Sequence, residues 1–143
     1  MKRLIYIPLV ILLIQCKGGL KTSAYAISEE TLNVIIDPSE NMQKRGDRTT
    51  ISRMEVLGDY LSINVSYSGG CEEHEFKLLS DGRYSATYPP EVELVLRHDA
   101  NNDMCRSYLD ETLFFDLKPL QYVGTTRVLI RLTNNDKLYE YNY

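Results

Sequence analysis

Apolar and polar side chains alternate along much of the chain after residue 50. The longest run covers residues 61–67, where apolar side chains alternate with serines and an asparagine. A second run, residues 92–96, follows the prolines at 89 and 90, which exclude a helix there. Successive side chains of a β-strand point to opposite faces of its sheet, so each run predicts a strand with one buried and one solvated face.

Turn-forming residues separate the other apolar segments, which predict further short strands. Gly58-Asp59 and Asp81-Gly82 are dipeptides typical of tight hairpins, and Asn134-Asn135-Asp136 predicts the turn between the last two strands. Only residues 104–112, which contain no proline, leave room for a helix. The further strands are expected at residues 33–36, 54–57, 76–79, 113–117, 127–132 and 138–143.

About seven short strands with turns between them indicate an all-β fold. We therefore predict a small antiparallel β-sandwich, Ig-like, or a small barrel. The length fits one β domain at residues 29–143. A signal peptide at residues 1–15 and a small, polar tether at residues 16–28 would precede it.

The first sixteen residues resemble a bacterial lipoprotein signal. Two basic residues precede Leu4–Ile14, a mostly apolar run that is too short to span roughly 30 Å of hydrocarbon. Cys16 follows this run with Leu13 three positions before it, as in a lipobox, although Gln15 stands where the pattern usually has a small residue. The sequence therefore predicts that Cys16 becomes the lipid-bearing N-terminus of the mature protein.

An ordinary secretory cleavage site is the alternative. Ala24-Tyr25-Ala26 has the small-x-small pattern of such a site, but it lies far beyond the apolar run. A lipidated Cys16 would carry more than one acyl chain, which gives stable membrane attachment. Lys17 offers no clear signal for retention in the inner membrane, so we expect the periplasmic side of the outer membrane.

The charge balance restricts the partners. The sequence holds 16 basic and 20 acidic residues, for a net charge of −4 at pH 7. Removal of residues 1–15 takes away Lys2 and Arg3, which leaves 14 basic residues and a net charge of −6. Nucleic acids and anionic head groups are bound through Lys and Arg, so we expect neither as a direct partner. The lipid would reach the membrane, and no protein partner or ligand is indicated.

The chain has 11 tyrosines and no tryptophan. Tyrosine favours strands, and it combines an apolar body with a polar tip. We interpret these residues as the core and rim of a small β domain, with an aromatic carbohydrate platform as the alternative. Tyr139, Tyr141 and Tyr143 are spaced by two and would share one face of the last strand.

Four residues able to bind metal or to form a disulfide lie within one short window. They form the pairs Cys71-x-x-His74 and His98-x6-Cys105. Gly69-Gly70 allows a sharp bend before the first pair, and the polar segment 99–103 turns back before Cys105. If both turns lie at the same end of the sandwich, the four side chains can converge.

The same segment resembles a known group of proteins. Tyr67-Ser68-Gly69-Gly70-Cys71-x-x-His74-x-Phe76, followed by His98, Cys105 and Phe115-Asp116-Leu117, is similar to a pattern in uncharacterised bacterial lipoproteins with one small β domain. The resemblance covers roughly residues 60–120. It implies that Cys71, His74, His98 and Cys105 belong to one feature, and it implies no known activity.

Two hypotheses compete for these four residues. An exported domain lies in an oxidising compartment, where Cys71 and Cys105 would pair as a disulfide with the histidines as neighbours. Alternatively, Cys71, His74, His98 and Cys105 form a tetrahedral zinc site, although the spacing of the second pair is looser than in zinc fingers. We therefore expect no cofactor, with zinc as the alternative. A nucleophilic pair of Cys71 and His98 is a formal third option, which a partner cysteine disfavours.

Other chemistry has weak signals. Asp99, Asn101 and Asp103 alternate as calcium ligands do, but Met104 stands where such a loop requires glycine, so an Asx-rich turn explains them better. The chain lacks the nucleophile elbow, the P-loop and the dinucleotide-binding motif. We therefore expect a membrane-anchored binding, structural or accessory module of the cell envelope and not an enzyme, with a periplasmic zinc-binding protein as the alternative.

Overall fold

The computed structural model describes residues 30–39, 41–44, 46–133 and 135–143. The predicted signal peptide, lipidation site and tether lie outside these residues. The described chain folds as eight strands with one short 3-10 helix, so the all-β prediction is confirmed. No helix in the described part is long and apolar enough to cross a membrane. The elements are β1 (Thr31–Ile36), β2 (Thr50–Leu57), β3 (Tyr60–Gly69), β4 (Glu75–Ser80), β5 (Glu91–Asp99), β6 (Ser107–Asp116), η1 (Lys118–Leu120), β7 (Arg127–Leu132) and β8 (Leu138–Asn142).

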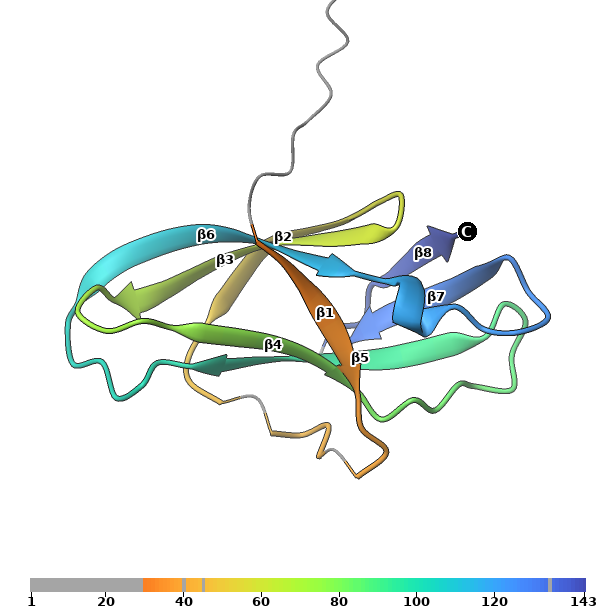
Figure 1. The fold of residues 1–143 in the computed structure, drawn as a ribbon, viewed down its shortest axis with the longest axis horizontal. Coiled ribbons are helices and arrows are strands. Elements are labelled where there is room, and N and C mark those ends of the chain that lie inside the picture. Colours follow the sequence, from red (N-terminus) through yellow and green to blue (C-terminus); the bar gives the residue numbers. More distant parts are fainter. Residues whose placement is uncertain (1–29, 40, 45, 134) are drawn as a thin grey trace, which may run out of the picture.

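The strands follow the order β2-β3-β6-β1-β4-β5-β7-β8. β1 links the two halves of this order, because its first residues pair with β6 and its last residues pair with β4. In Figure 1, β1 accordingly runs obliquely from β6 towards β4 and β5. The outer strands β2 and β8 also contact each other. The sheet therefore folds into a nearly closed sandwich around one core.

The pairing is mixed and not purely antiparallel as predicted. β1 is parallel to both β4 and β6, and β5 is parallel to β7. The hairpins β2–β3 and β7–β8 are antiparallel. A period-two pattern shows which face of a strand is buried, but it is the same for both strand directions. The sequence could therefore predict the strands without their relative directions.

The structure corrects one local prediction and decides a segment that the sequence left open. Residues 104–112 do not form a helix, because β6 begins at Ser107 and pairs with β3 along its whole length. The pairing partner thus outweighs local propensity there. Asp81-Gly82 does not form a two-residue hairpin either, since the connection from β4 to β5 runs from Asp81 to Pro90. Gly58-Asp59 does form the predicted tight turn between β2 and β3, with Gly58 at φ +60°.

The core lies between the inward faces of the strands. The alternating apolar residues of β3 and β5 are buried there, as predicted. Tyr141 is fully buried, and Tyr139 and Tyr143 pack against the same core, which confirms their shared face. The central buried side chains are Leu61, Ile63, Val65, Val92, Leu94, Phe115, Val128 and Ile130.

The inward faces end in aromatic and imidazole rings at one end of the sandwich. Residues 92, 94 and 96 of β5 are buried on one face of the strand. His98 continues this face and is 2% exposed. Phe76 of β4 lies opposite His98 in the strand register, and His74 precedes it by two positions. Tyr67 takes the corresponding inward position near the end of β3. Strand periodicity therefore brings both histidines to one place.

Candidate functional site

A disulfide closes this end of the sandwich. It joins Cys71, in the connection after β3, to Cys105, in the connection before β6. The two Cα atoms are 5.9 Å apart, within the usual range of about 4.4–6.8 Å. The bond therefore ties together the segments that lead into β4 and β6.

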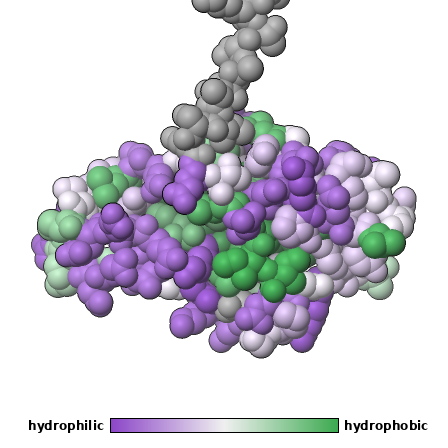
Figure 2. Space-filling view, in the orientation of Figure 1, coloured by the Kyte–Doolittle hydropathy of each residue, from purple (hydrophilic) through white to green (hydrophobic). Residues whose placement is uncertain are grey.

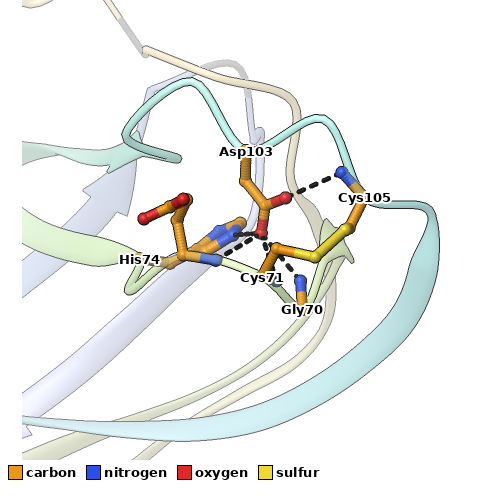
Figure 3. The surroundings of a disulfide bond; sticks show 6 residues. Gly70, Cys71, His74, Asp103 and Cys105 are labelled. Carbon is orange, nitrogen blue, oxygen red and sulfur yellow. Dashed lines mark hydrogen bonds and ion pairs between the residues drawn. A yellow bond between two sulfur atoms is a disulfide. The ribbon is translucent and has the colours of Figure 1, made fainter.

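The carboxylate of Asp103 lies between the disulfide and His74 (Figure 3). Its Oδ2 accepts backbone N–H groups from Gly70 at 2.8 Å, Cys71 at 2.9 Å and Glu72 at 3.0 Å, while its Oδ1 accepts the N–H of Cys105 at 2.7 Å. The side chain has no exposed area. These hydrogen bonds, chiefly those from Cys71 and Glu72, hold the pKa of Asp103 well below its ordinary value. Asp103 therefore stays ionised and fixes the loop that carries Cys71.

The two histidines continue from Asp103 as a row of hydrogen bonds. His74 Nε2 lies 3.2 Å from Asp103 Oδ2, and His74 Nδ1 lies 2.8 Å from His98 Nε2. His98 Nδ1 lies 2.7 Å from Thr49 Oγ1. A carboxylate can only accept, so His74 donates through Nε2 and, when neutral, accepts from His98 Nε2. His98 Nδ1 then accepts the hydroxyl proton of Thr49, and every polar atom in the row is paired.

Close packing holds the row in place. The rings of His98 and Phe76 stack with centroids 4.4 Å apart, and the ring of Tyr67 packs on His74 at 4.6 Å. A Cβ at position 69 would overlap the His74 ring, so Gly69 is required by close approach. Burial and a hydrogen bond to Glu111 raise the pKa of Tyr67 to about 12.

The segment 46–49 is held against β5 from the other side. Gly46 forms a bridge with His98 and has φ +83°, and a Cβ there would overlap the His98 carbonyl oxygen. The N–H of Asp47 donates to the same oxygen at 2.7 Å, and its carboxylate accepts the N–H of Ala100 at 2.8 Å. These contacts hold the backbone of residues 46–49 against β5, and they place the Thr49 hydroxyl next to His98.

The row can hold one additional proton but not two. Burial, and then the neighbouring His74, lower the pKa of His98. A proton added at His98 Nδ1 makes that nitrogen a donor to Thr49 Oγ1 and leaves the other two bonds unchanged. A second proton, at His74 Nδ1, would set N–H groups of both rings against each other across 2.8 Å.

The structure gives the zinc hypothesis no support. Both sulfur atoms are bonded to each other, and the nitrogens that a metal would need are paired with protein groups. Donor atoms of Cys71, Asp103 and Cys105 do lie within 4.8 Å of one another. However, the Asp103 oxygens already accept four backbone N–H groups. The Asx-rich interpretation of residues 99–103 agrees with the side-chain bonds from Asp99 and Asp103 to nearby N–H groups.

A hydroxyl that donates to a histidine also occurs in nucleophilic catalysis. The pocket beside Thr49 and His98 measures about 240 Å³, which is below the range of about 300–1,000 Å³ typical of small-molecule sites. The formal pair of Cys71 and His98 has no free thiol, because Cys71 is in the disulfide. We therefore interpret the row as a structural network.

A larger cleft lies on the other side of His74, between β4 and β6. We call it the β4–β6 cleft; it measures about 690 Å³. Figure 2 shows hydrophobic side chains gathered on this face around the end of β1, where Ile35 and Ile36 are 41% and 42% exposed. Apolar and acidic residues line the cleft, among them Glu30, Leu32, Glu75, Phe76, Glu111 and Leu113.

Sequence reasoning brought the right residues together but missed their partners. The structure places Cys71, His74, His98 and Cys105 at one end, as the resemblance implied. The sequence indicates Asp103 only as a turn or calcium residue, and Thr49 lies in a segment without periodicity. The Asx pattern before Cys105 was the one available signal for Asp103. Nothing in the sequence pointed to Thr49.

Fold and site together define a class of protein, namely a disulfide-closed all-β sandwich with an open cleft between two of its strands. The family of the NigD-like C-terminal beta sandwich domain matches residues 33–143, so the chain belongs to this family. A search of curated proteins returned no match.

Two solved structures share the fold. One is a NigD-like immunity protein from Bacteroides caccae, with 14% identity and a TM-score of 0.55, covering 77% of this chain and 58% of that chain. The other is a protein of unknown function from Bacteroides vulgatus, with 17% identity and a TM-score of 0.52, covering 79% of this chain and 56% of that chain. At these identities the likeness shows the fold alone. The chain spans less than two thirds of either solved protein.

Proposed function

We propose that the protein is a lipid-anchored binding module of the bacterial cell envelope, and that it binds a protein in the manner of an immunity protein. The family match over residues 33–143 is the observation that carries this proposal. One solved protein of the same fold is described as a NigD-like immunity protein. Binding of a protein partner requires an accessible surface and no catalytic group.

The disulfide supports the location. Disulfides persist in oxidising compartments, and Cys71–Cys105 lies in a chain whose first residues resemble a lipoprotein signal. A lipid on Cys16 would hold the domain at the membrane through the segment before β1, with the outer membrane as the expected site. The acidic net charge of −4 favours attachment through lipid over attachment through basic residues.

The site supports binding over catalysis. The row from Asp103 to Thr49 is buried and fully paired, so its groups serve the fold. The β4–β6 cleft is open and lies beside this rigid support. A rigid wall next to an open cleft suits a binding surface, because little ordering is needed when a partner docks.

Fractionation of cells that produce Cys16→Ser tests the anchor. We expect the wild-type protein in the membrane fraction, and the variant either soluble or with its signal uncleaved. Ser23→Ala, in the predicted tether, serves as the matched control, because it leaves both the lipidation site and the disulfide intact. A mature N-terminus at Ile27 without lipid, found by mass spectrometry, would contradict the anchor.

Competition between strains tests the binding role. A deletion strain is grown together with a parent strain that secretes toxins, and relative survival is counted. We expect the deletion strain to be lost faster, with rescue by the wild-type protein and weaker rescue by Cys16→Ser. Equal survival against every toxin-secreting competitor of the same species would reject the immunity role.

A further inference from the structure

The strand β6 has one covered and one uncovered edge. Along one edge it pairs with β3 from Ser107 to Asp116. Along the other edge β1 covers only Phe114–Asp116, and no strand among the described residues pairs there with residues 107–113. Backbone N–H and C=O groups of alternate residues point to each edge of a strand. Within the described residues, this stretch therefore presents a row of backbone groups without a strand partner.

β4 has the same property on the facing side. β1 pairs with β4 only at Leu78–Ser80, so residues 75–77 have no described strand partner on that side. β4 and β6 thus diverge from β1, and the β4–β6 cleft of about 690 Å³ lies between them. The Cys71–Cys105 disulfide ties the segments that lead into the two strands. Both walls of the cleft are therefore fixed.

The lining of the cleft combines apolar and acidic residues. Leu32, Phe76 and Leu113 provide apolar surface, and the carboxylates of Glu30 and Glu111 add negative charge. Lys77 is the one basic residue in the described lining, and it pairs with Glu75 at 2.9 Å. The cleft therefore has a net negative rim over a partly apolar floor.

We propose that the β4–β6 cleft takes an extended, basic segment of a protein partner, which pairs with the uncovered edge of β6 as an added strand. This inference rests on the proposed binding function and names the surface and the chemistry of the partner. In strand addition, main-chain hydrogen bonds supply affinity and alternate side chains supply specificity. One face of the segment would place apolar side chains on Leu32, Phe76 and Leu113. Its Lys and Arg residues would lie near Glu30 and Glu111.

Charge complementarity favours a basic partner over the other occupants. The chain's own segment before the rim residue Glu30 reads Ser28-Glu29 and would add another carboxylate to an acidic rim. A second copy of the chain would bring the same acidic rim. Like charges that face each other across paired strands are destabilising, so both occupants are disfavoured.

Hydrogen exchange in the full chain tests whether the edge is open. Per-residue exchange is measured by NMR on the purified protein at low concentration. We expect alternate amides of residues 107–113, those that point away from β3, to exchange much faster than their neighbours. Uniform protection of these amides would show that the chain's own segment or a second copy already covers the edge, and it would overturn the proposal. Dependence of that protection on protein concentration would separate the two.

Selection from a phage-displayed library of random nonapeptides tests the partner chemistry. We expect selected peptides to alternate Lys or Arg with β-branched or aromatic residues, and to protect the open amides of residues 107–113. A synthetic copy with alternate amides N-methylated keeps its charge but loses its donors, and we expect it not to bind. Failure to select any peptide, a set without excess basic residues, protection at another site, or unchanged binding after N-methylation would overturn the proposal.

Charge reversal on the protein completes the test. We expect Glu30→Lys combined with Glu111→Lys to weaken binding of the selected peptide by about tenfold, since the charge pairs proposed at these two carboxylates are lost and reversed. Glu140→Lys, on β8 outside the cleft, is the matched control and should leave binding unchanged. An equal loss of peptide affinity in the control, or no loss in the double variant, would reject the cleft as the binding site. A failure here would leave strain competition unaffected, which distinguishes this inference from the proposed function.

Discussion

The two ends of the sandwich are both rich in aromatic residues, but they differ in chemistry. At one end Tyr67, His74 and His98 pack beside Asp103 and the disulfide. At the other end Tyr84 packs on Tyr122 and Tyr141 packs on Tyr143, near the turn between β2 and β3. The same inward periodicity of the strands places aromatic rings at both ends. What differs is which polar atoms the rings carry.

The difference decides how each end responds to its surroundings. The disulfide–histidine end contains a reducible bond and the imidazole of His98, whose pKa is lowered by burial. At the tyrosine end, burial raises the pKa of Tyr84 and of Tyr141 to about 12. Only the first end should therefore respond to redox conditions and to mild acid.

Removal of the disulfide should have the largest effect. The closed loop has a sequence separation of 34 residues. In the chain-entropy description, a loop of this size contributes about 3–4 kcal/mol to the free energy of unfolding. We expect Cys71→Ala with Cys105→Ala to lose about that amount in urea unfolding, and wild-type protein in reductant to lose the same. A variant as stable as the oxidised wild type would show that the bond does not hold this end.

Asp103→Asn should have the next largest effect. The amide has one acceptor oxygen where the carboxylate accepts four backbone N–H groups and faces His74, so several of these donors lose their partner. We expect a clearly lower urea midpoint than for the exposed control Asp136→Asn. Equal midpoints for the two variants would mean that Asp103 does not organise the loop.

Tyr141→Phe tests the opposite end. The Tyr141 hydroxyl donates to Asp59 at 2.8 Å and accepts from Gln121 at 3.0 Å. Loss of a buried hydroxyl of this kind costs about 1–2 kcal/mol, and we expect the loss to be constant between pH 5 and pH 8. Tyr108→Phe, at a side chain that is 74% exposed, should be neutral. A loss that varies with pH in this range would break the contrast between the two ends.

The smallest expected change is that of the free energy of unfolding with pH. The pKa of His98 is lower in the folded chain, so the unfolded chain binds more protons as the pH falls below about 6.5. The free energy of unfolding should therefore fall as the pH is lowered from 7 to 5. We expect His98→Gln to flatten this slope, while Tyr141→Phe keeps it. The same slope in both variants would place the titrating group elsewhere.

The sequence predicted the strands and the meeting of the histidines because both follow from side-chain parity. The alternation of β5, continued to residue 98, places His98 on the inward face, where it meets His74. The parallel pairings and the partners of the histidines could not be predicted in the same way. Thr49 and Asp103 come from connections whose position depends on how distant strands close. Residues 104–112 do not alternate regularly, and pairing with β3 makes their second part a strand.

Non-reducing peptide mapping of native protein most directly tests whether a disulfide, and not a metal, closes the histidine end. Trypsin should release residues 54–77, which contain Cys71, and residues 98–106, which contain Cys105. We expect these two peptides to be joined by one bond that reductant separates, with no free thiol at either cysteine before or after chelation. Two separate peptides, with thiols at Cys71 and Cys105 that become reactive only after a chelator removes zinc, would contradict this assignment.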